Sequence, residues 1–417
     1  MFRSFVLLLT AATVLPAQNG GPSALRFSGE FALRYEDRIG INFQPGADRN
    51  YLLLRSRLAA EWRAAPWLTF SAMAQDARVP LYGEDAPAPL RDTLDLQEAY
   101  ADFFAGRERG FSARVGRHMA RYGESRLIGA PQWLNVARTY DAVSLRYRTP
   151  GVQWEILHLS VVPVLPTVFN RPNLNDRIWG TYNVFENWIR GGEVEIYVLR
   201  HDQNRRGGFA LPGGRHVNLF GTRVVSPLPS GLRLEIETVG QTGSEGGKPH
   251  RAHAWFSGLS RRIPGRVPVD LASEYKYASG TDDPGGARSG TFDQLYPANH
   301  DKFGRADLFG WRNIHNLRGQ VNVHPARGLV LTVMYNNSWL ASPRDALYAG
   351  PGRPITRAPL GDAGRHLGHE ADFYASFKRG RLQLGAGVAK LFAGEYLRRT
   401  IPGANNRFFY VLQTLSF

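Results

Sequence analysis

Apolar and polar residues alternate with a period of two along much of this 417-residue chain. In residues 54–63, Leu58 and Trp62 fall on one face, while Arg55 and Arg57 fall on the other. This period is typical of a β-strand with one apolar and one polar face. The pattern recurs in three later segments, 193–198, 232–238 and 369–378. The sequence therefore predicts an all-β protein whose strands separate two different environments.

The connections between the predicted strands alternate between short and long. Eight tight turns, most of them with Pro or Gly, lie near 64–66, 106–110, 150–151, 191–192, 229–231, 264–265, 325–328 and 379–381. Nine longer, mostly polar stretches lie near 37–48, 79–91, 121–137, 163–177, 204–214, 243–248, 280–311, 343–365 and 400–406. These connections would join 18 strands, although segments 152–162 and 215–226 alternate poorly.

Two architectures use strands with one apolar and one polar face: the soluble sandwich and the membrane barrel. Sandwiches commonly have about seven to nine strands in roughly 100 residues, whereas this pattern continues to the end of the chain without a linker. A membrane barrel has an even number of strands, short periplasmic turns and long outer loops, and its closure removes the sheet edges that a bilayer does not tolerate. We therefore predict a transmembrane antiparallel β-barrel of about 18 strands.

The N-terminus and the composition indicate an exported protein. Residues 1–17 have the features of a secretory signal peptide, because Arg3 precedes an apolar run from Phe5 to Leu15 and Ala17 is the small residue before the cleavage point. Residues 18–417 would then form one barrel domain in the cell outer membrane. The chain has no cysteine, which excludes disulfides and thiolate metal sites. The net charge of +15 does not indicate nucleic acid in an exported chain; an anionic ligand, anionic lipid or internal ion pairs are better candidates.

The C-terminus supports the same prediction. The chain ends in an amphipathic strand at Phe417, which resembles the signal that the barrel assembly machinery recognises in outer-membrane proteins. Aromatic residues at strand ends would form girdles at the level of the outer-membrane lipid headgroups; the candidates are Trp62, Trp67, Tyr147 and Trp188.

Arginine dominates the polar face of the predicted strands. Only five of the 51 basic residues are lysine, and a guanidinium binds a carboxylate through two hydrogen bonds. By strand parity, the arginines expected to line the lumen are Arg55, Arg57, Arg114, Arg146, Arg148, Arg233, Arg251 and Arg318. They would contact an acidic polysaccharide or a small anionic solute. The alternative is that facing Arg and Glu residues brace the wall as cross-strand pairs.

The longest connection, residues 280–311, is both polar and aromatic. Loops of this length are usually functional or disordered, and its aromatic residues argue against disorder. We expect it to fold against or into the barrel mouth and narrow the pore, packed by Phe292, Tyr296, Phe303 and Trp311 and bonded to the wall by Asp293, His300 and Asp307. The alternative is an outer loop ordered by its own side chains.

Enzymatic and metal sites are not expected. His300, Asp301, Asp307 and His315 match no standard metal-ligand spacing, and Asp282, Asp283 and Asp293 are an equally weak calcium set. The chain lacks the G-x-S-x-G nucleophile elbow of a lipase. We therefore expect no catalytic residues, no metal and no cofactor.

Several segments resemble the alginate export family of outer-membrane barrels over roughly residues 95–417. They are "GRHMARYGESRLIG" at 116–129, "WLNVARTYDAVSLRY" at 133–147 and "HEADFYASFK" at 369–378 with the "FFYVLQTLSF" tail. In the long loop the matching positions are Phe292, Asp293, Leu295, Pro297, His300, Gly304, Asp307, Gly310, Trp311 and Asn313. One departure is His118, where the family has Gln after the Gly-Arg pair.

The resemblance implies a monomeric 18-stranded pore that passes an acidic polysaccharide such as alginate through an arginine-rich lumen. The expected function is an outer-membrane channel for anionic saccharides or related small anions. A general diffusion porin and a non-transporting surface scaffold remain as alternatives.

Overall fold

The computed structural model describes residues 25–417 apart from residues 45, 84, 105–108, 205–212 and 301. Within these residues, eighteen strands form one antiparallel sheet. They are β1 (Leu25–Ile39), β2 (Arg49–Ala65), β3 (Leu68–Arg78), β4 (Asp92–Phe104), β5 (Gly110–His118), β6 (Thr139–Thr149), β7 (Val152–Val162), β8 (Asp176–Glu186), β9 (Glu193–Gln203), β10 (Arg215–Pro227), β11 (Leu232–Glu245), β12 (Lys248–Ile263), β13 (Val269–Ala278), β14 (Ile314–Ala326), β15 (Leu329–Leu340), β18 (His366–Arg379), β19 (Leu382–Ala393) and β20 (Asn406–Ser416).

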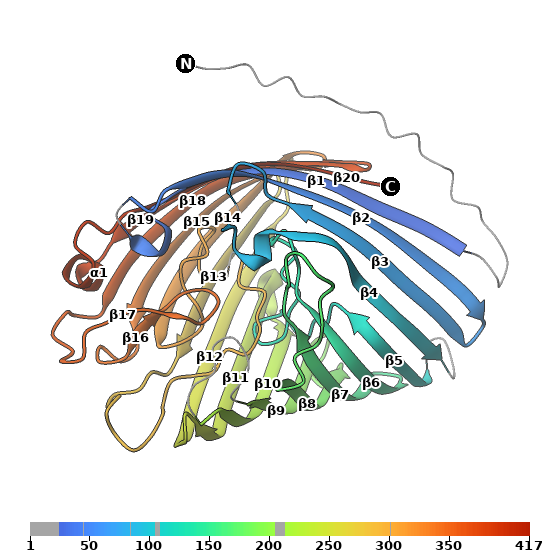
Figure 1. Cartoon of the computed structure of the whole chain (residues 1–417), viewed down its shortest axis with the longest axis horizontal. Helices are drawn as coiled ribbons and strands as arrows, with labels where there is room; N and C mark the ends of the chain where they lie inside the picture. The colour runs from blue at the N-terminus through green and yellow to red at the C-terminus, as the bar shows by residue number, and fades with distance from the viewer. Residues whose placement is uncertain (1–24, 45, 84, 105–108, 205–212, 301) are drawn as a thin grey trace.

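Each strand of the sheet pairs with its neighbour in the chain, and the last strand pairs with the first. The closing β1–β20 ladder runs from Glu30 opposite Ser416 to Ile39 opposite Arg407. The result is a closed barrel whose C-terminus lies at the same end as the short turns (Figure 1). The predicted fold class and the count of 18 strands are confirmed.

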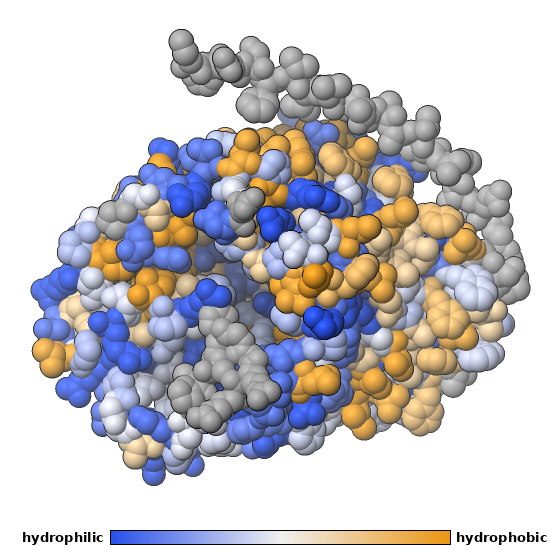
Figure 2. Space-filling model, viewed as in Figure 1, coloured by the Kyte–Doolittle hydropathy of each residue, from blue (hydrophilic) through white to orange (hydrophobic). Residues whose placement is uncertain are grey.

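The two faces of the wall follow the predicted alternation. On β2, the Arg57 side chain faces inward and is 7% exposed, while the next residue, Leu58, faces outward and is 54% exposed. The four girdle residues Trp62, Trp67, Tyr147 and Trp188 are all exposed and lie near the short turns. Figure 2 shows hydrophobic side chains gathered on the wall over β3–β6 and hydrophilic ones over the end with α1, β16 and β17.

Smaller elements lie in the connections. A hairpin of β16 (Ala346–Tyr348) and β17 (Pro354–Arg357) joins β15 to β18, and α1 (Glu395–Thr400) joins β19 to β20. Three short 3-10 turns lie at Ile41–Phe43, Ala88–Leu90 and Pro229–Gly231. The connection expected as a longer loop at 243–248 is a tight turn instead, because β11 and β12 extend to Glu245 and from Lys248. The proposed signal peptide, residues 1–17, lies outside the described residues.

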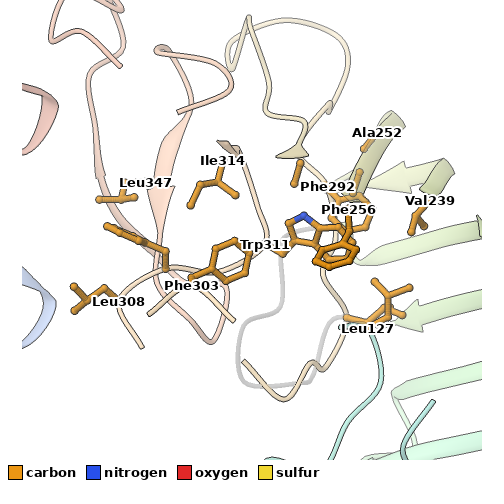
Figure 3. Close-up of a cluster of buried hydrophobic side chains, with 14 of the residues drawn as sticks. Leu127, Val239, Ala252, Phe256, Phe292, Phe303, Leu308, Trp311, Ile314 and Leu347 are labelled. Atoms are coloured by element: carbon orange, nitrogen blue, oxygen red, sulfur yellow. The ribbon is translucent and has the colours of Figure 1, made fainter. Parts of the chain in front are cut away.

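Two long loops enter the barrel from the long-loop end: the β5–β6 loop (residues 119–138) and the β13–β14 loop (residues 279–313). Together with lumen-facing wall residues they form the largest buried apolar cluster of the described chain. Trp311, 2% exposed, lies at its centre between Phe303 and Phe256 (Figure 3). The apolar core of this barrel is therefore inside the lumen, between the loops and the wall.

This internal core reverses one predicted orientation. Ala252, Ala254 and Phe256 on β12 are buried against the loops, so Arg251 shares the outward face with Trp255. The prediction that Arg251 lines the lumen is wrong. The parity was misassigned because the inner face of β12 is apolar at the level where the loops pack, and the charged residue was taken for the inner one.

Candidate functional site

The β5–β6 loop spans the lumen from one wall to the other. Nη1 of Arg126 lies 2.7 Å from Oε1 of Glu235 and 2.8 Å from Oε2 of Glu237, both on β11. Near the other end of the loop, the backbone oxygen of Trp133 accepts a 2.6 Å hydrogen bond from Arg34 on β1. Ion pairs with good geometry and little exposure hold a segment firmly, since breaking one leaves a charge buried. The β5–β6 loop is thus fixed at both ends to different parts of the wall and crosses the lumen between them.

The β13–β14 loop is anchored by Asp293. Its carboxylate lies 2.7 Å from Nδ1 of His201 and 3.3 Å from Nη1 of Arg215, and its backbone N–H donates to Gln241. Burial alone would raise the pKa of Asp293, but the charges of Arg215 and His201 lower it well below its usual value. Asp293 therefore stays ionised and joins the loop to three adjacent strands, β9 to β11.

The two loops also bind each other. The backbone N–H of Tyr296 donates to Leu127 at 2.8 Å, and that of Gly129 donates to Tyr296 at 2.9 Å. The rings of Trp133 and His300 are stacked with centroids 3.9 Å apart and an interplanar angle of 4°. The loops therefore form one unit inside the barrel.

His300 and Asp307 differ in part from the expected arrangement. We expected both to bond the wall; instead Nδ1 of His300 lies 2.6 Å from Oδ2 of Asp307 within the same loop, and the His300 ring stacks on the second loop. The third expected anchor, Asp293, does bond the wall strands. Trp311, expected only to pack the loop, also donates through Nε1 to the backbone oxygen of Tyr277 at 2.9 Å. Asp301 lies outside the described residues.

Beneath the β5–β6 loop, a pocket of about 320 Å³ opens in the lumen wall. Arg114 and Arg146 line it together with Arg121 of the loop. Arg114 makes two bonds of 2.7 and 2.8 Å to Asp102, and Arg146 makes two of 2.7 and 3.1 Å to Glu155. Arg121 is exposed, and none of the described carboxylates pairs with it. The pocket thus presents one unpaired guanidinium beside two paired ones.

The remaining predicted arginines face the lumen and differ in the groups that their guanidiniums contact. Arg55 and Arg318 pair with carboxylates, Glu30 at 2.7 Å and Glu274 at 3.3 Å. Arg57 bonds Gln75 and Gln132 and also lies 3.8 Å from Glu30. Arg148 bonds Gln153, and Arg233 is exposed with no carboxylate partner among the described residues. Five of the seven, Arg55, Arg57, Arg114, Arg146 and Arg318, therefore pair with carboxylates of the wall, as the alternative interpretation expected.

A larger cavity, about 510 Å³, lies at the mouth above Asp293; we call it the basic vestibule. Its lining comes from the ends of β9 to β11, the β13–β14 loop and the β16–β17 hairpin. Six cationic side chains line it, Arg215, Lys248, Arg288, Arg312, Arg353 and Arg357, against three carboxylates, Glu245, Asp293 and Asp345. An excess of cations in a concave site favours an anionic occupant.

Arg312 is the most enclosed of the loop cations in the vestibule. Its guanidinium lies over the ring of Tyr348 at 4.7 Å, and its nearest carboxylate, Glu245, is 3.6 Å away. Its Nε is buried without a hydrogen-bond partner among the described atoms. Burial raises the pKa of Tyr348 to about 12, and Asp345 adds to this, so the phenol stays neutral. A guanidinium beside a neutral ring can bind a carboxylate and an apolar sugar or aromatic face together.

Sequence reasoning did not identify the vestibule. Its residues come from five separate segments, and strand parity says nothing about loop cations. The one available signal was the run of arginines at 344, 353 and 357 in the connection before β18. In the part of the chain that the structure describes, no group of three metal-ligating side chains converges, and no helix is long and apolar enough to cross a membrane.

A closed 18-stranded barrel with an apolar outer wall and a polar, loop-narrowed lumen defines an outer-membrane channel. Solved structures of similar fold agree. OpdK of Pseudomonas aeruginosa is 10% identical, with 94% of this chain and 98% of that chain covered and a TM-score of 0.63. OpdO is 12% identical (94% and 97%, TM-score 0.62) and OccK8 (OprE) is 8% identical (94% and 98%, TM-score 0.64), both from the same organism.

The sequence model of the alginate export family matches residues 23–411. The chain therefore belongs to the alginate export family, and it is a channel of the outer membrane, not an enzyme. No curated protein sequence matches it.

Proposed function

We propose that this channel passes anions, with acidic saccharides such as alginate-like polyuronates as the main substrate class and other small carboxylates as the second. The observation that supports this most is the basic vestibule, where cations outnumber carboxylates at the mouth. A polyuronate has one carboxylate per sugar, so successive residues would exchange between Arg312, Arg357 and the arginines of the lower pocket. Several weak sites in series suit passage better than one tight site.

Two further observations support the same class. Arg121 of the β5–β6 loop is an exposed cation in the lower pocket, so an anion that moves past the vestibule would meet another guanidinium. OpdK, whose fold is similar, has been crystallised with vanillate, an aromatic carboxylate. The pair of Arg312 and Tyr348 would suit a ligand that joins a carboxylate to a ring.

Planar-bilayer recording in a salt gradient tests the proposal. The triple variant Arg288→Gln, Arg312→Gln and Arg357→Gln should shift the reversal potential toward cations and weaken block by oligouronates. One charge at 4 Å in water is worth about 1 kcal/mol, or roughly fivefold in local anion concentration. The matched control is Arg251→Gln, which removes an exposed cation from the outer wall of the same end. Unchanged selectivity in the folded triple variant favours a general diffusion pore, and no current in the wild type favours a scaffold.

We also propose that residues 1–17 are removed on export, that the barrel assembly machinery inserts the chain through its C-terminal strand, and that the channel acts as a monomer. N-terminal sequencing of the mature protein and light scattering in detergent check the first and last points. A C-terminal Phe417 deletion should reduce insertion into the membrane.

A further inference from the structure

The outer wall at the extracellular ends of β18 to β20 has two distinct levels. At the lower level the outward residues are exposed and apolar, with Val388 on β19 opposite Phe409 on β20. Two residues further toward the loops, the outward pair is Lys390 opposite Arg407. On β18, Phe373 lies opposite Val388 and Ala371 lies opposite Lys390, while His369 lies one outward position further toward the loops, opposite the exposed Phe392. The lower level matches the hydrocarbon of the outer leaflet, so the upper level lies at its headgroups.

Lys390 and Arg407 are like charges in direct cross-strand register, an arrangement that destabilises a sheet unless an anion lies between them. The protein supplies little compensation. Asp37 lies 3.5 Å from Arg407, whose side chain is 50% exposed, and the Lys390 ammonium bonds the side-chain oxygen of Asn405. One carboxylate at 3.5 Å therefore faces two cations.

The positive surface continues around these two residues. Exposed Arg365 and Arg398 use their guanidiniums on backbone oxygens, those of Ala341 at 3.1 Å and Ala393 at 2.6 Å. The nearby carboxylate of Glu395 is paired with Arg399 at 2.8 Å. We call the set Arg365, His366, His369, Lys390, Arg398 and Arg407 the outer cation patch.

We propose that the outer cation patch binds the phosphate groups of a phosphorylated glycolipid in the outer leaflet. A free anion would use the cations alone, whereas a lipid would place its acyl chains on Val388, Phe409 and Phe373 and its phosphates on Lys390 and Arg407. An arginine guanidinium can donate two hydrogen bonds to the oxygens of one phosphate group. A phosphate between Lys390 and Arg407 also removes their mutual repulsion.

Lipid retention on the purified full-length barrel tests this. The probes are bisphosphorylated lipid A and the same lipid with its phosphates removed, added to the delipidated protein in detergent and quantified by native mass spectrometry. Each cation near a lipid headgroup is worth about fivefold in affinity, so Lys390→Gln with Arg407→Gln should weaken binding of the phosphorylated probe by about 25-fold. Arg379→Gln with Arg381→Gln, at the short turn between β18 and β19 and at the opposite end of the wall, is the matched control and should retain full binding.

The outcomes separate the alternatives. Equal binding of the two lipids, or equal binding by wild type and the Lys390/Arg407 variant, would overturn the proposal. Complete competition by inorganic phosphate would identify a free-anion site instead and would also overturn it. Arg365→Gln with Arg398→Gln is the second variant; it leaves the β19–β20 pair intact and should lower affinity by a similar factor.

Discussion

Trp133 should control how firmly the β5–β6 loop is held across the lumen. Its ring is stacked on His300 at 3.9 Å, the Arg34 guanidinium lies 3.9 Å from the ring centroid, and Tyr410 contacts it edge-on at 4.9 Å. Trp133→Ala removes these three contacts and the longer ones to Phe408 at 6.3 Å and Arg305 at 5.1 Å, while the backbone bond from Arg34 to residue 133 can persist. The change therefore tests the ring alone.

The size of the effect follows from these contacts. An aromatic pair is worth about 1 kcal/mol beyond its buried area, and a cation over a ring contributes about 1 kcal/mol at a partly exposed site. Two ring contacts and one cation contact give about 3 kcal/mol. That corresponds to about a 150-fold increase in the ratio of undocked to docked loop.

Single-channel recording measures the result. The Trp133→Ala channel should show frequent transitions to a higher conductance, and trypsin should cleave at Arg126 or Arg138 faster than in wild type. Trp133→Phe, which keeps a ring over His300, should recover most of the wild-type behaviour. If Trp133→Ala conducts and resists trypsin as wild type does, the loop does not depend on this stack and the reasoning is wrong.

Three other changes probe the loops. Arg126→Gln leaves Glu235 and Glu237 without their cation from the loop and should lower the free energy of unfolding by about 3–5 kcal/mol. The temperature of heat-modifiable migration should fall accordingly. The control Arg78→Gln, in an exposed pair with Asp76, should lower the free energy of unfolding by under about 1 kcal/mol. Gly304→Ala should undock the β13–β14 loop by about 2 kcal/mol, because φ is +113° and its Cβ would lie 2.2 Å from Glu370; Gly319→Ala, with open space around it, should be silent in the same proteolysis assay. The docked Asp293 has a lowered pKa, so its stabilisation is complete above its unfolded value of about 4 and is lost as pH falls below it. Loop protection in hydrogen exchange, corrected for intrinsic rates, should therefore not fall between about pH 6 and pH 5 and should fall below about pH 4. A loss already complete at pH 5 would contradict this assignment.

The barrel was predictable because its signals are local. The alternation at Arg57 and Leu58 and the glycines and prolines of the short turns each depend on a few adjacent residues. The insertion of the β13–β14 loop was also expected, since Phe292 and Trp311 are too apolar for an exposed loop.

The contacts within the lumen were not predictable, because they join distant segments. Nothing near Arg126 in the sequence indicates that it meets Glu237, 111 positions away. The role of the β5–β6 loop was missed for this reason, and so was the vestibule. The prediction for Arg251 was wrong for a different reason. The parity rule assumes a polar lumen, whereas the packed loops make the lumen apolar at the level of Arg251.

Side-chain contacts to the inner loops reinforce the seam between β1 and β20, where the first and last strands pair. Arg34 and Arg38 on β1 bond the backbone of both inner loops, at Trp133 and Ala306, and Arg305 of the β13–β14 loop donates to Tyr410 on β20 at 2.7 Å. These contacts connect β1 and β20 through the inner loops, in addition to the backbone ladder between the two strands. The docked loops therefore help to hold the first and last strands of the sheet together from inside the barrel. Lateral separation of β1 from β20 would therefore also break the contacts that hold the inner loops in the lumen.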